Sequence, residues 1–270
     1  MKNKVVIITG ASSGIGYACA WEFASKGASV VLAARNKELT EKLAADLTLK
    51  GYDAFSWRTD VSVEDDCRKL IDAAISKYGR IDVLINNAGI SMRALFHEVD
   101  IEVLKKVMDI NFWGTVYCSK YALPHIIESG GTIAGISSIA GFHGLPGRTG
   151  YSASKFAMIG FLEALRIENM KKGLHVLVAA PGFTSSNIRK TALAANGSPQ
   201  GESPRHEDSL MPAEEVAGHI YTAIKKRKRS LILSNEGRST VLLKRLAPAL
   251  LDKLIYYNLA REPDSPFKNS

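Results

Sequence analysis

The chain has 270 residues and a formal net charge of +8, and 46% of its residues are hydrophobic. This length and composition suit one large globular α/β domain with a substantial core, so a second domain is not needed. The sequence contains no apolar run long enough to span a membrane and no export signal at its start, which predicts a cytoplasmic protein. The three cysteines are widely spaced and form no C-x-x-C pair, so we expect reduced thiols rather than a disulfide framework.

The positive charge is concentrated at the C-terminal end. Residues 225–270 carry eleven Lys or Arg and four Asp or Glu, which leaves the rest of the chain nearly neutral. The run 225–229 consists entirely of cations and could attract nucleic acid or anionic lipid. We interpret it instead as a solvated helix end that complements the helix dipole, and we expect no nucleic acid partner.

A strand, a glycine-rich turn and a helix are predicted at the start of the chain. The apolar run 5–9 is followed by Gly10-Ala11-Ser12-Ser13-Gly14-Ile15-Gly16 and then by a helical pattern. Glycines let the backbone turn tightly and approach a pyrophosphate, whose charge is met by the N-terminus of the helix. The residues that we assign to nucleotide binding here are Gly10, Ser12, Ser13, Gly14, Ile15 and Gly16. A P-loop is excluded because no Lys-Ser or Lys-Thr follows the last glycine.

Arg35 follows the second predicted strand, 29–34, at the position where a dinucleotide fold contacts the adenosine ribose. An Asp or Glu at this position would accept a hydrogen bond from the 2′-hydroxyl, whereas an arginine would pair with a 2′-phosphate. The sequence therefore predicts NADP(H) rather than NAD(H). The alternative is that Arg35 merely faces solvent.

The alternation of strands and helices continues along the chain. Helices are predicted at 38–50 and 63–77, and strands at 54–58, 82–85, 132–136, 176–179 and 230–233, as in a parallel doubly wound sheet. Asp60 and Val61 follow the third strand and could touch the adenine. Asn87, Ala88 and Gly89 follow the fourth strand and suit a chain that lies against a ligand, although a plain turn uses the same residues.

Tyr151 and Lys155 lie four residues apart at a predicted helix start, so their side chains share one face. A lysine ammonium beside a phenol favours the phenolate, which brings the tyrosine pKa toward a range useful for proton transfer. The alternative is a surface lysine beside a half-buried tyrosine. Ser138 follows the fifth strand and could face the phenol and hold a carbonyl oxygen. Asn111 lies inside the helical pattern 101–128, where its amide must find a partner, kink the helix or, as is more common, face solvent.

Six motifs together resemble the short-chain dehydrogenase/reductase family. In order, and at the family's spacing, they are Thr9-Gly10-x-x-x-Gly14-Ile15-Gly16, Asn86-Asn87-Ala88-Gly89, Asn111, Ser138, Tyr151-x-x-x-Lys155 and Pro181-Gly182. The resemblance covers residues 4 to about 235. It implies one α/β domain at 1–235, with a doubly wound, seven-stranded parallel Rossmann sheet and helices on both faces.

The same resemblance implies a catalytic set of Asn111, Ser138, Tyr151 and Lys155. Tyr151 would give a proton to a carbonyl oxygen as hydride arrives from the nicotinamide, and Ser138 would polarise that oxygen. Lys155 would bind the nicotinamide ribose and lower the tyrosine pKa. Asn111, through a helix kink, would hold a water that links the lysine to solvent. The implied reaction interconverts a ketone or aldehyde and an alcohol.

The segment after the sixth strand is expected to contact both nicotinamide and substrate. By resemblance, Pro181, Gly182, Thr184 and Ser186 would contact the nicotinamide carboxamide, and many family members carry a threonine in place of Ser186. Residues 187–210 lose periodicity and become rich in Ser, Pro, Gly and charge, which predicts a mobile substrate lid. The candidate pocket walls are mostly apolar and predict a lipophilic substrate: Met92, Phe142, His143, Leu145, Phe183 and Ile188. We interpret His143 as a surface residue.

Residues 236–270 form a basic extension of the same domain, because many short members of the family end near the last strand. An apolar stripe with adjacent cations runs through 240–258, and Pro248 is expected to break it into two short helices, the second of which starts at the proline. This stripe could pack on the domain, cover the substrate pocket, meet a partner subunit or lie on the inner face of a membrane. Packing on the domain is the leading interpretation.

Two classes of function remain after these observations. The first is an NADP(H)-dependent carbonyl reductase or alcohol dehydrogenase, which by family resemblance forms a homodimer or homotetramer. The second is a catalytically idle protein that binds or senses nucleotide on the same fold. A hydrolase is excluded because Ile139 occupies the position where a nucleophile elbow needs glycine. The six histidines are scattered and form no H-E-x-x-H motif, so we expect no metal.

Overall fold

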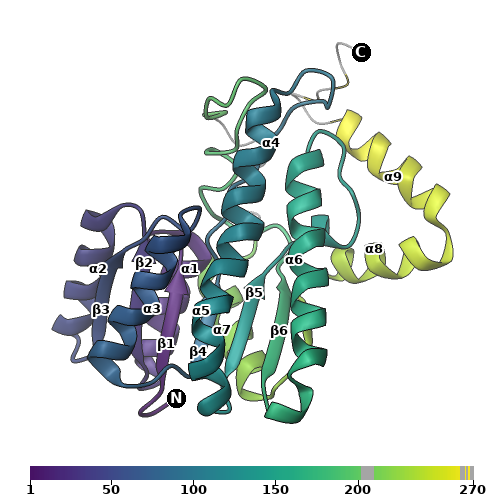
Figure 1. Cartoon of the computed structure of the whole chain (residues 1–270). Coiled ribbons are helices and arrows are strands. Elements are labelled where there is room, and N and C mark those ends of the chain that lie inside the picture. The colour runs from purple at the N-terminus through teal and green to yellow at the C-terminus, as the bar shows by residue number, and fades with distance from the viewer. Residues whose placement is uncertain (202–209, 262–264, 266, 268–270) are drawn as a thin grey trace.

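The strands form one parallel seven-stranded sheet in the order β3-β2-β1-β4-β5-β6-β7 (Figure 1). Their bounds are β1 Val5–Thr9, β2 Ser29–Ala34, β3 Ala54–Arg58, β4 Val83–Asn86, β5 Thr132–Ile136, β6 His175–Ala180 and β7 Ser230–Ile232. The structure is a computed structural model that describes residues 1–201, 210–261, 265 and 267. The strand order reverses between β1 and β4, and this reversal opens a crevice at the carboxyl edge of the sheet. The predicted Rossmann fold is confirmed.

Helices cover both faces of the sheet. Their bounds are α1 Gly14–Ser25, α2 Lys37–Leu49, α3 Glu64–Tyr78, α4 Ile101–Met108, α5 Gly114–Glu128, α6 Thr149–Glu168 and α7 Ala213–Lys225. Buried side chains of α1, α2 and α7 form one core with the sheet, and those of α3, α5 and α6 form a second core on the opposite face. The predicted strand 230–233 differs from β7 by one residue at one end, and the predicted strands 82–85 and 176–179 and helices 38–50 and 63–77 differ from the observed elements by one residue at each end.

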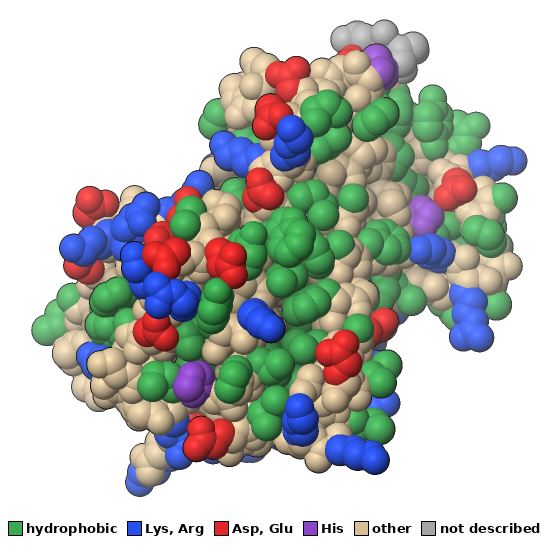
Figure 2. Space-filling model, in the orientation of Figure 1, with side chains coloured by type: hydrophobic (Ala, Val, Ile, Leu, Met, Phe, Trp, Pro, Cys, Tyr) green, Lys and Arg blue, Asp and Glu red, His purple; other side chains and the backbone are tan. Residues whose placement is uncertain are grey.

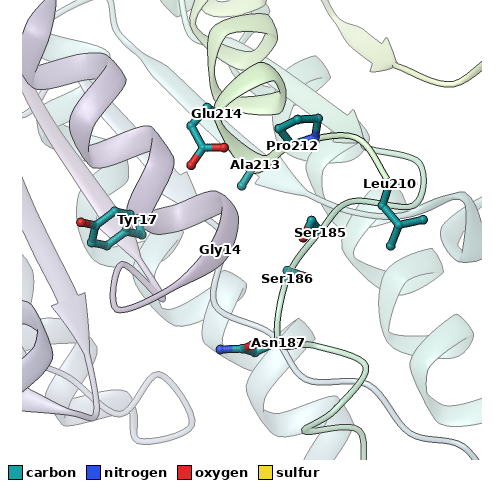
Figure 3. A pocket seen from close by; sticks show the side chains of 9 residues that line it. All are labelled: Gly14, Tyr17, Ser185, Ser186, Asn187, Leu210, Pro212, Ala213 and Glu214. Carbon is teal, nitrogen blue, oxygen red and sulfur yellow. The ribbon is translucent and has the colours of Figure 1, made fainter. Parts of the chain in front are cut away.

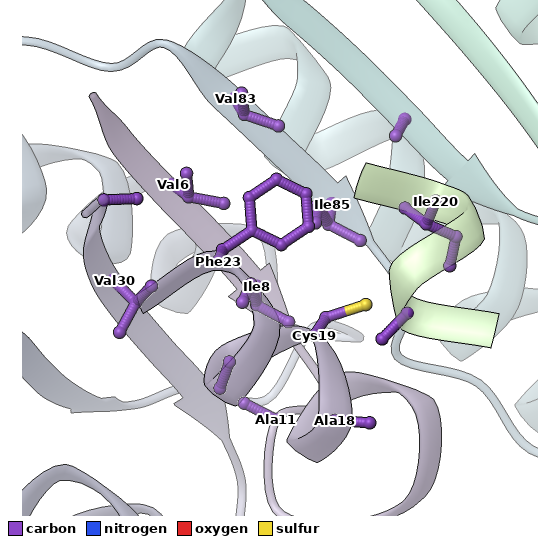
Figure 4. Close-up of a cluster of buried hydrophobic side chains, with 14 of the residues drawn as sticks. Val6, Ile8, Ala11, Ala18, Cys19, Phe23, Val30, Val83, Ile85 and Ile220 are labelled. Carbon is purple, nitrogen blue, oxygen red and sulfur yellow. The ribbon is translucent and has the colours of Figure 1, made fainter. Parts of the chain in front are cut away.

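The alternation of side chains along β1 divides these two cores. Val6 and Ile8 point into the core of α1, α2 and α7, whereas Val5 and Ile7 point into the other. All five residues of β1 are buried because helices cover the sheet on both sides, which is why Val5–Ile8 are all apolar and do not alternate with polar residues. In Figure 4 the ring of Phe23, from α1, lies among side chains of the sheet.

The three cysteines are free thiols within these cores, as predicted. Cys19 lies on α1 in the first core, and Cys67 on α3 and Cys118 on α5 lie in the second. Burial raises the pKa of the Cys19 thiol, and the pKa of Cys118 is raised first by its hydrogen bond with Cys67 and then by burial. The Cys19 and Cys118 thiols are therefore protonated at neutral pH, and all three cysteines are buried.

The predicted helix at 101–128 is not continuous. A π-helical turn, Asp109–Trp113, separates α4 from α5 and contains Asn111. A wider turn of this kind redirects side chains that a regular helix would present elsewhere. The irregularity therefore lies at one of the predicted catalytic residues.

Two further helices, α8 Asn235–Leu246 and α9 Pro248–Ala260, form what we call the C-terminal arm. Its second helix begins at Pro248, as predicted, because proline fits the first position of a helix and interrupts one that precedes it. In Figure 1 the arm lies at the right, beside α6 and away from β3. Within the part of the chain that the structure describes, no helix combines the length and hydrophobicity that crossing a membrane requires.

Candidate active site

The glycine turn after β1 is fastened to the turn after β4. Asn87 Nδ2 donates hydrogen bonds to the carbonyl oxygens of Thr9 and Gly10, at 2.9 and 3.2 Å. Thr9 Oγ1 accepts hydrogen bonds from the backbone N–H groups of Asn87 and Ala88, at 3.0 and 3.1 Å. Asn87 was predicted to touch the nucleotide, which stays a prediction. In the structure its amide joins the turn after β1 to the turn after β4. The contribution of the Thr9 hydroxyl was not predicted.

Three glycines of the turn are required by its backbone or its packing. Gly10 and Gly14 have φ angles of +66° and +54°, in the left-handed region that glycine adopts without strain. A Cβ at Gly16 would collide with the carbonyl oxygen of Gly10 and lie 2.5 Å from Asn87 Nδ2. The turn therefore brings the start of α1 close to the β4 turn, and no side chain at position 16 fits between them.

A cavity of about 370 Å³ lies at the start of α1. Figure 3 shows Gly14 opposite Ser185, Ser186 and Asn187, and the start of α7 closes the cavity through residues 212–214. Ser13 precedes the helix and makes no capping hydrogen bond with the described chain, so its hydroxyl and the first N–H groups of α1 can bind an anion. The residues present fit the pyrophosphate of a dinucleotide, although Glu214 brings one carboxylate to the far wall.

The adenosine end of the predicted site lies beyond β2 and β3. Arg35 is exposed directly after β2 and forms no ion pair with any residue that the structure describes. Asp60 Oδ1 accepts hydrogen bonds from the N–H and hydroxyl of Ser62, at 3.0 and 2.7 Å. Val61 is buried against Gly114, where a Cβ would lie 2.8 Å from the valine side chain. The carboxylate of Asp60 therefore shapes the turn before α3.

Asn111 is fully buried, so the interpretation of a solvent-facing amide was wrong. Its Oδ1 accepts a hydrogen bond from the N–H of Ile90 at 2.8 Å, and its Nδ2 donates to the carbonyl oxygen of Ile90 at 2.9 Å. The same Nδ2 donates to Ser154 Oγ at 2.9 Å, and Ser154 in turn donates to the carbonyl oxygen of Tyr151. The π-helical turn thus links the chain after β4 with the first turns of α6.

Lys155 is buried one turn after Tyr151 on α6, as the spacing predicts. Its Nζ donates to the carbonyl oxygen of Ile136 at 2.8 Å and lies 5.8 Å from the centre of the Tyr151 ring. Burial lowers the pKa of Lys155 to about 8. Gly89 lies beside this group, since a Cβ there would be 3.4 Å from Lys155 Nζ and 3.1 Å from Asn111 Oδ1. A glycine therefore leaves space next to the ammonium.

Tyr151 and Ser138 meet across the loop that connects β5 with α6. Burial raises the pKa of the Tyr151 phenol, and this effect outweighs the hydrogen bond with Ser138 and the charges of Arg148 and Arg189, which lower it. The lowering of this pKa by Lys155 stays a prediction; in this structure the ammonium donates to the Ile136 carbonyl oxygen. The hydroxyls of Tyr151 and Ser138 can together bind one oxygen atom and exchange a proton with it.

Arg148 and Arg189 are the charged neighbours of Tyr151 that the sequence did not indicate. Arg189 is buried, and its Nη2 donates to the carbonyl oxygen of Thr184 at 2.7 Å. It belongs to a segment without periodicity, where nothing in the sequence distinguishes an inward-facing cation from a solvated one. The positive charges of these two arginines lower the pKa of the Tyr151 phenol.

The predicted nicotinamide turn follows β6 directly. Thr184 is buried, and its hydroxyl donates to the carbonyl oxygen of Gly182 at 3.2 Å, while Ser186 faces the cavity at α1. Pro181 is buried at the start of this turn. Within this turn, Ser186 borders the cavity and Gly182 lies against Ser234, directly before the C-terminal arm.

The described part of the predicted lid is attached to the chain after β4. The N–H of Leu193 donates to the carbonyl oxygen of Ser91, and the N–H of Arg93 donates to the carbonyl oxygen of Leu193, both at 2.9 Å. Leu193 and the fully buried Met92 form a small apolar cluster against Tyr151. Residues 202–209 of the lid lie outside the described residues, and its mobility stays a prediction.

The remaining predicted pocket walls are apolar and partly buried, with one exception. They are Phe142, Leu145, Phe183 and Ile188. His143 is buried rather than on the surface, because α9 lies over it and brings Asp252 Oδ1 to 3.5 Å from its Nε2. Burial lowers the pKa of His143, Asp252 raises it and Lys244 lowers it. No cluster of metal-binding side chains occurs among the described residues.

Comparisons with known proteins point in one direction. The family described as short chain dehydrogenase matches residues 4–197. The chain is 38% identical to 11-beta-hydroxysteroid dehydrogenase A of Arachis hypogaea, over 97% of this chain and 78% of that protein. It is 34% identical to dehydrogenase/reductase SDR family member 7B of Mus musculus, over 98% of this chain and 84% of that protein.

Among solved structures, a short chain dehydrogenase/reductase from Burkholderia phymatum in complex with NAD is similar, with a TM-score of 0.82 and 26% identity. The likeness covers 92% of this chain and 95% of that one. An alcohol dehydrogenase from Thermococcus sibiricus, complexed with 5-hydroxy-NADP, shares the fold with a TM-score of 0.76, 24% identity and coverage of 85% of this chain and 95% of that one. Both kinds of nicotinamide nucleotide therefore occur among structures of this shape.

Proposed function

Because the chain belongs to the short-chain dehydrogenase family, we propose that it is an NADP(H)-dependent oxidoreductase that interconverts a lipophilic ketone or aldehyde and the corresponding alcohol. The observation that carries this proposal is the meeting of Ser138, Tyr151 and Lys155 beside a turn suited to pyrophosphate. In such a reaction the protein must hold the reacting oxygen and exchange a proton with it, and these residues can do both.

The mechanism assigns one task to each side chain. Ser138 Oγ donates a hydrogen bond to the substrate oxygen and orients it, and Tyr151 Oη gives that oxygen a proton in reduction or takes it in oxidation. The nicotinamide, when bound, supplies or accepts the hydride. Arg148 and Arg189 make the phenol more acidic than burial alone would.

Lys155 and Asn111 organise the part of the site around Tyr151. The Lys155 ammonium, with space beside it at Gly89, is positioned to bind the nicotinamide ribose. Asn111 holds the turn after β4 against α6 through its bonds to Ile90 and Ser154. The residues proposed to hold the rest of the nucleotide are those predicted from the sequence in the glycine turn, after β2, β3 and β4, and in the turn after β6.

The preference for NADP(H) rests on Arg35. Its exposed guanidinium, without an ion pair in the described chain, is available to a 2′-phosphate at the edge of β2. Replacing Ala34 by Asp and Arg35 by Ser should shift the ratio of NADPH to NADH efficiency by about 100-fold toward NADH, since a charge-assisted contact is lost and a ribose acceptor is gained. The control is Lys37→Ser, a neighbouring exposed cation that pairs with Glu41. Equal ratios in the double variant and the control would refute the assignment.

A lipophilic substrate is supported by the apolar pocket walls and by the hydroxysteroid dehydrogenase name of a relative. The decisive experiment measures NADPH and NADH oxidation against a panel of aldehydes, ketones, keto-steroids and keto-lipids. Tyr151→Phe should bind NADPH normally and lose at least about 1,000-fold in kcat, because only the proton donor is removed. Tyr256→Phe, on the exposed surface of α9, is the control.

The outcome also separates the two functions left open by the sequence. Turnover that the Tyr151→Phe variant loses supports the oxidoreductase. Nucleotide binding without turnover of any substrate would favour a nucleotide-binding or sensing protein. Turnover retained by Tyr151→Phe would refute the proposed acid and base.

We also propose that copies of the chain associate with one another and that the C-terminal arm contacts a membrane surface. Apolar side chains gather near the centre of the face in Figure 2, over α5 and α6. Trp113, in the π-helical turn before α5, and Phe156, on α6, are exposed aromatic residues. We propose a homodimer or homotetramer built on this face. The exposed apolar and basic side chains of 240–258 support weak contact with a membrane surface, which would place a cytoplasmic protein at the inner face of a membrane.

A further inference from the structure

The C-terminal arm contacts the turn that carries Ser138, which we call the serine turn, residues 138–143. At the start of α8, Ser234 Oγ caps the helix by accepting a hydrogen bond from the N–H of Gly237 at 2.9 Å. A Cβ at Gly237 would collide with the side chain of Ile139, so the helix lies directly on this turn. The same Ser234 lies against Gly182 on the other side, where a Cβ would be 2.8 Å from its Cβ and Oγ.

Lys244 forms the next contact along α8. Its Nζ donates a hydrogen bond to the carbonyl oxygen of Phe142 at 2.5 Å. The same ammonium lies 4.6 Å from the centre of the Phe156 ring, on α6 and adjacent to Lys155 in the chain. One cation therefore joins the end of the serine turn to the helix that carries Tyr151.

Backbone and side-chain hydrogen bonds within the serine turn connect Phe142 with Ser138. The N–H groups of Phe142 and His143 both donate to the carbonyl oxygen of Ile139, at 2.9 and 3.0 Å. Ser138 Oγ accepts a hydrogen bond from the N–H of Ala140 at 3.2 Å. Hydrogen bonds within the turn therefore connect Ser138 and Phe142 to the residues 139–140 between them.

The second helix of the arm contacts the same turn. Asp252 of α9 lies 3.5 Å from His143 Nε2, while His143 Nδ1 is buried and has no hydrogen-bond partner among the described residues. Three residues of the turn, Ile139, Phe142 and His143, are thus contacted by a segment that begins about one hundred residues later in the chain.

We infer that Lys244 is a positioning residue for the reaction: by holding the Phe142 carbonyl against α6, it sets the placement of Ser138 opposite Tyr151 and of the substrate wall at Phe142 and His143. The arm is then a component of the substrate side of the site. This inference rests on the proposed oxidoreductase function, since it assigns an effect on the carbonyl substrate and none on the nucleotide.

The test compares Lys244→Met with two matched variants. Methionine keeps a long apolar stem over Phe156 and removes the donor to the Phe142 carbonyl. Lys244→Arg restores a cation and donors, and Arg245→Met removes the neighbouring charge of α8, for which the structure gives no contact with the serine turn. Each variant is assayed as the full chain for kcat and KM with the best carbonyl substrate, for the Kd of NADPH by fluorescence, and for amide hydrogen exchange.

The expected result is local. Lys244→Met should lower kcat/KM by about five- to tenfold, as the loss of one hydrogen bond implies, and should leave the NADPH Kd within about twofold. The amides of Phe142 and His143 should exchange faster, and Lys244→Arg should recover both properties. Arg245→Met should resemble the unmodified protein.

Three results would overturn the inference. The first is Lys244→Met with the same kinetics and exchange as Arg245→Met. The second is a parallel loss of NADPH affinity, and the third is faster exchange throughout the chain, which would assign Lys244 to general stability. If the unmodified protein turns over no carbonyl compound, the proposed function fails, and unchanged exchange at Phe142 and His143 would separately refute the role of Lys244.

Discussion

The glycine turn after β1 and the C-terminal arm are held by different kinds of contact. At the turn, backbone approaches backbone so closely that a single methyl group at position 16 has no room. On the arm, several large apolar side chains are exposed, and Leu246 is 70% accessible to solvent. The turn is defined by steric exclusion, which tolerates little change, whereas the arm is held by a few contacts at its inner edge. A nucleotide site can thus stay fixed while the substrate side varies.

The largest effect expected from this difference is at Gly16. Gly16→Ala should lower the free energy of unfolding by about 3 kcal/mol and weaken NADPH binding at least about tenfold, because the added Cβ displaces the Gly10 carbonyl and Asn87. Gly218→Ala is the matched control, since a Cβ in this part of α7 meets nothing within 4 Å in the described chain. It should be neutral or stabilise by about 0.5–1 kcal/mol. Equal denaturation midpoints for the two variants would contradict the steric argument.

A smaller effect is expected from the buried ammonium of Lys155. Its pKa of about 8 in the folded protein is below the ordinary value of 10.5, so between these pH values the unfolded chain binds the extra proton. Stability therefore rises with pH across this window by about 1.4 kcal/mol per unit from this group. In denaturant titrations without nucleotide, the free energy of unfolding of the unmodified protein should rise between pH 8 and 10 by about 2 kcal/mol more than that of Lys155→Met. Parallel pH curves for the two proteins would show that the lysine is not desolvated.

The smallest effect is expected on the outer side of the arm. Leu246→Ser should change the free energy of unfolding by less than about 0.5 kcal/mol, because the side chain is already exposed. Leu251→Ser, at a residue of α9 that is 4% exposed, should cost about 2–3 kcal/mol. A comparable loss at Leu246, dependent on protein concentration, would reveal that another copy covers this side.

The elements could be predicted from the sequence where local chemistry defines them. Gly10, Gly14 and Gly16 identify a turn because the backbone and packing there accept no larger residue. Pro248 marks the start of α9 because proline lacks the N–H that an interior helical position needs. In both cases the local backbone geometry requires that residue type, so the residue reveals the geometry.

The misjudged residues depend on segments distant in the chain. The position of Asn111 alone favoured a solvent-facing side chain, and only the family resemblance indicated a helix kink there; its partners, the backbone of Ile90 and the hydroxyl of Ser154, are brought together by the tertiary fold. His143 was placed on the surface because α9, which covers it, follows it by more than a hundred residues. Arg189 was missed because its partner, the Thr184 carbonyl oxygen, is a backbone group that any sequence offers.

The distribution of the three thiols has a practical consequence. Cys19 lies between the sheet and one helical layer, and Cys67 and Cys118 lie between the sheet and the other. A thiol reagent attacks only an accessible thiolate. Labelling in native buffer therefore requires that the helices covering the cysteine separate transiently from the sheet. A variant that retains Cys19 alone and one that retains Cys118 alone would therefore record how often each side of this sandwich opens, without any added probe.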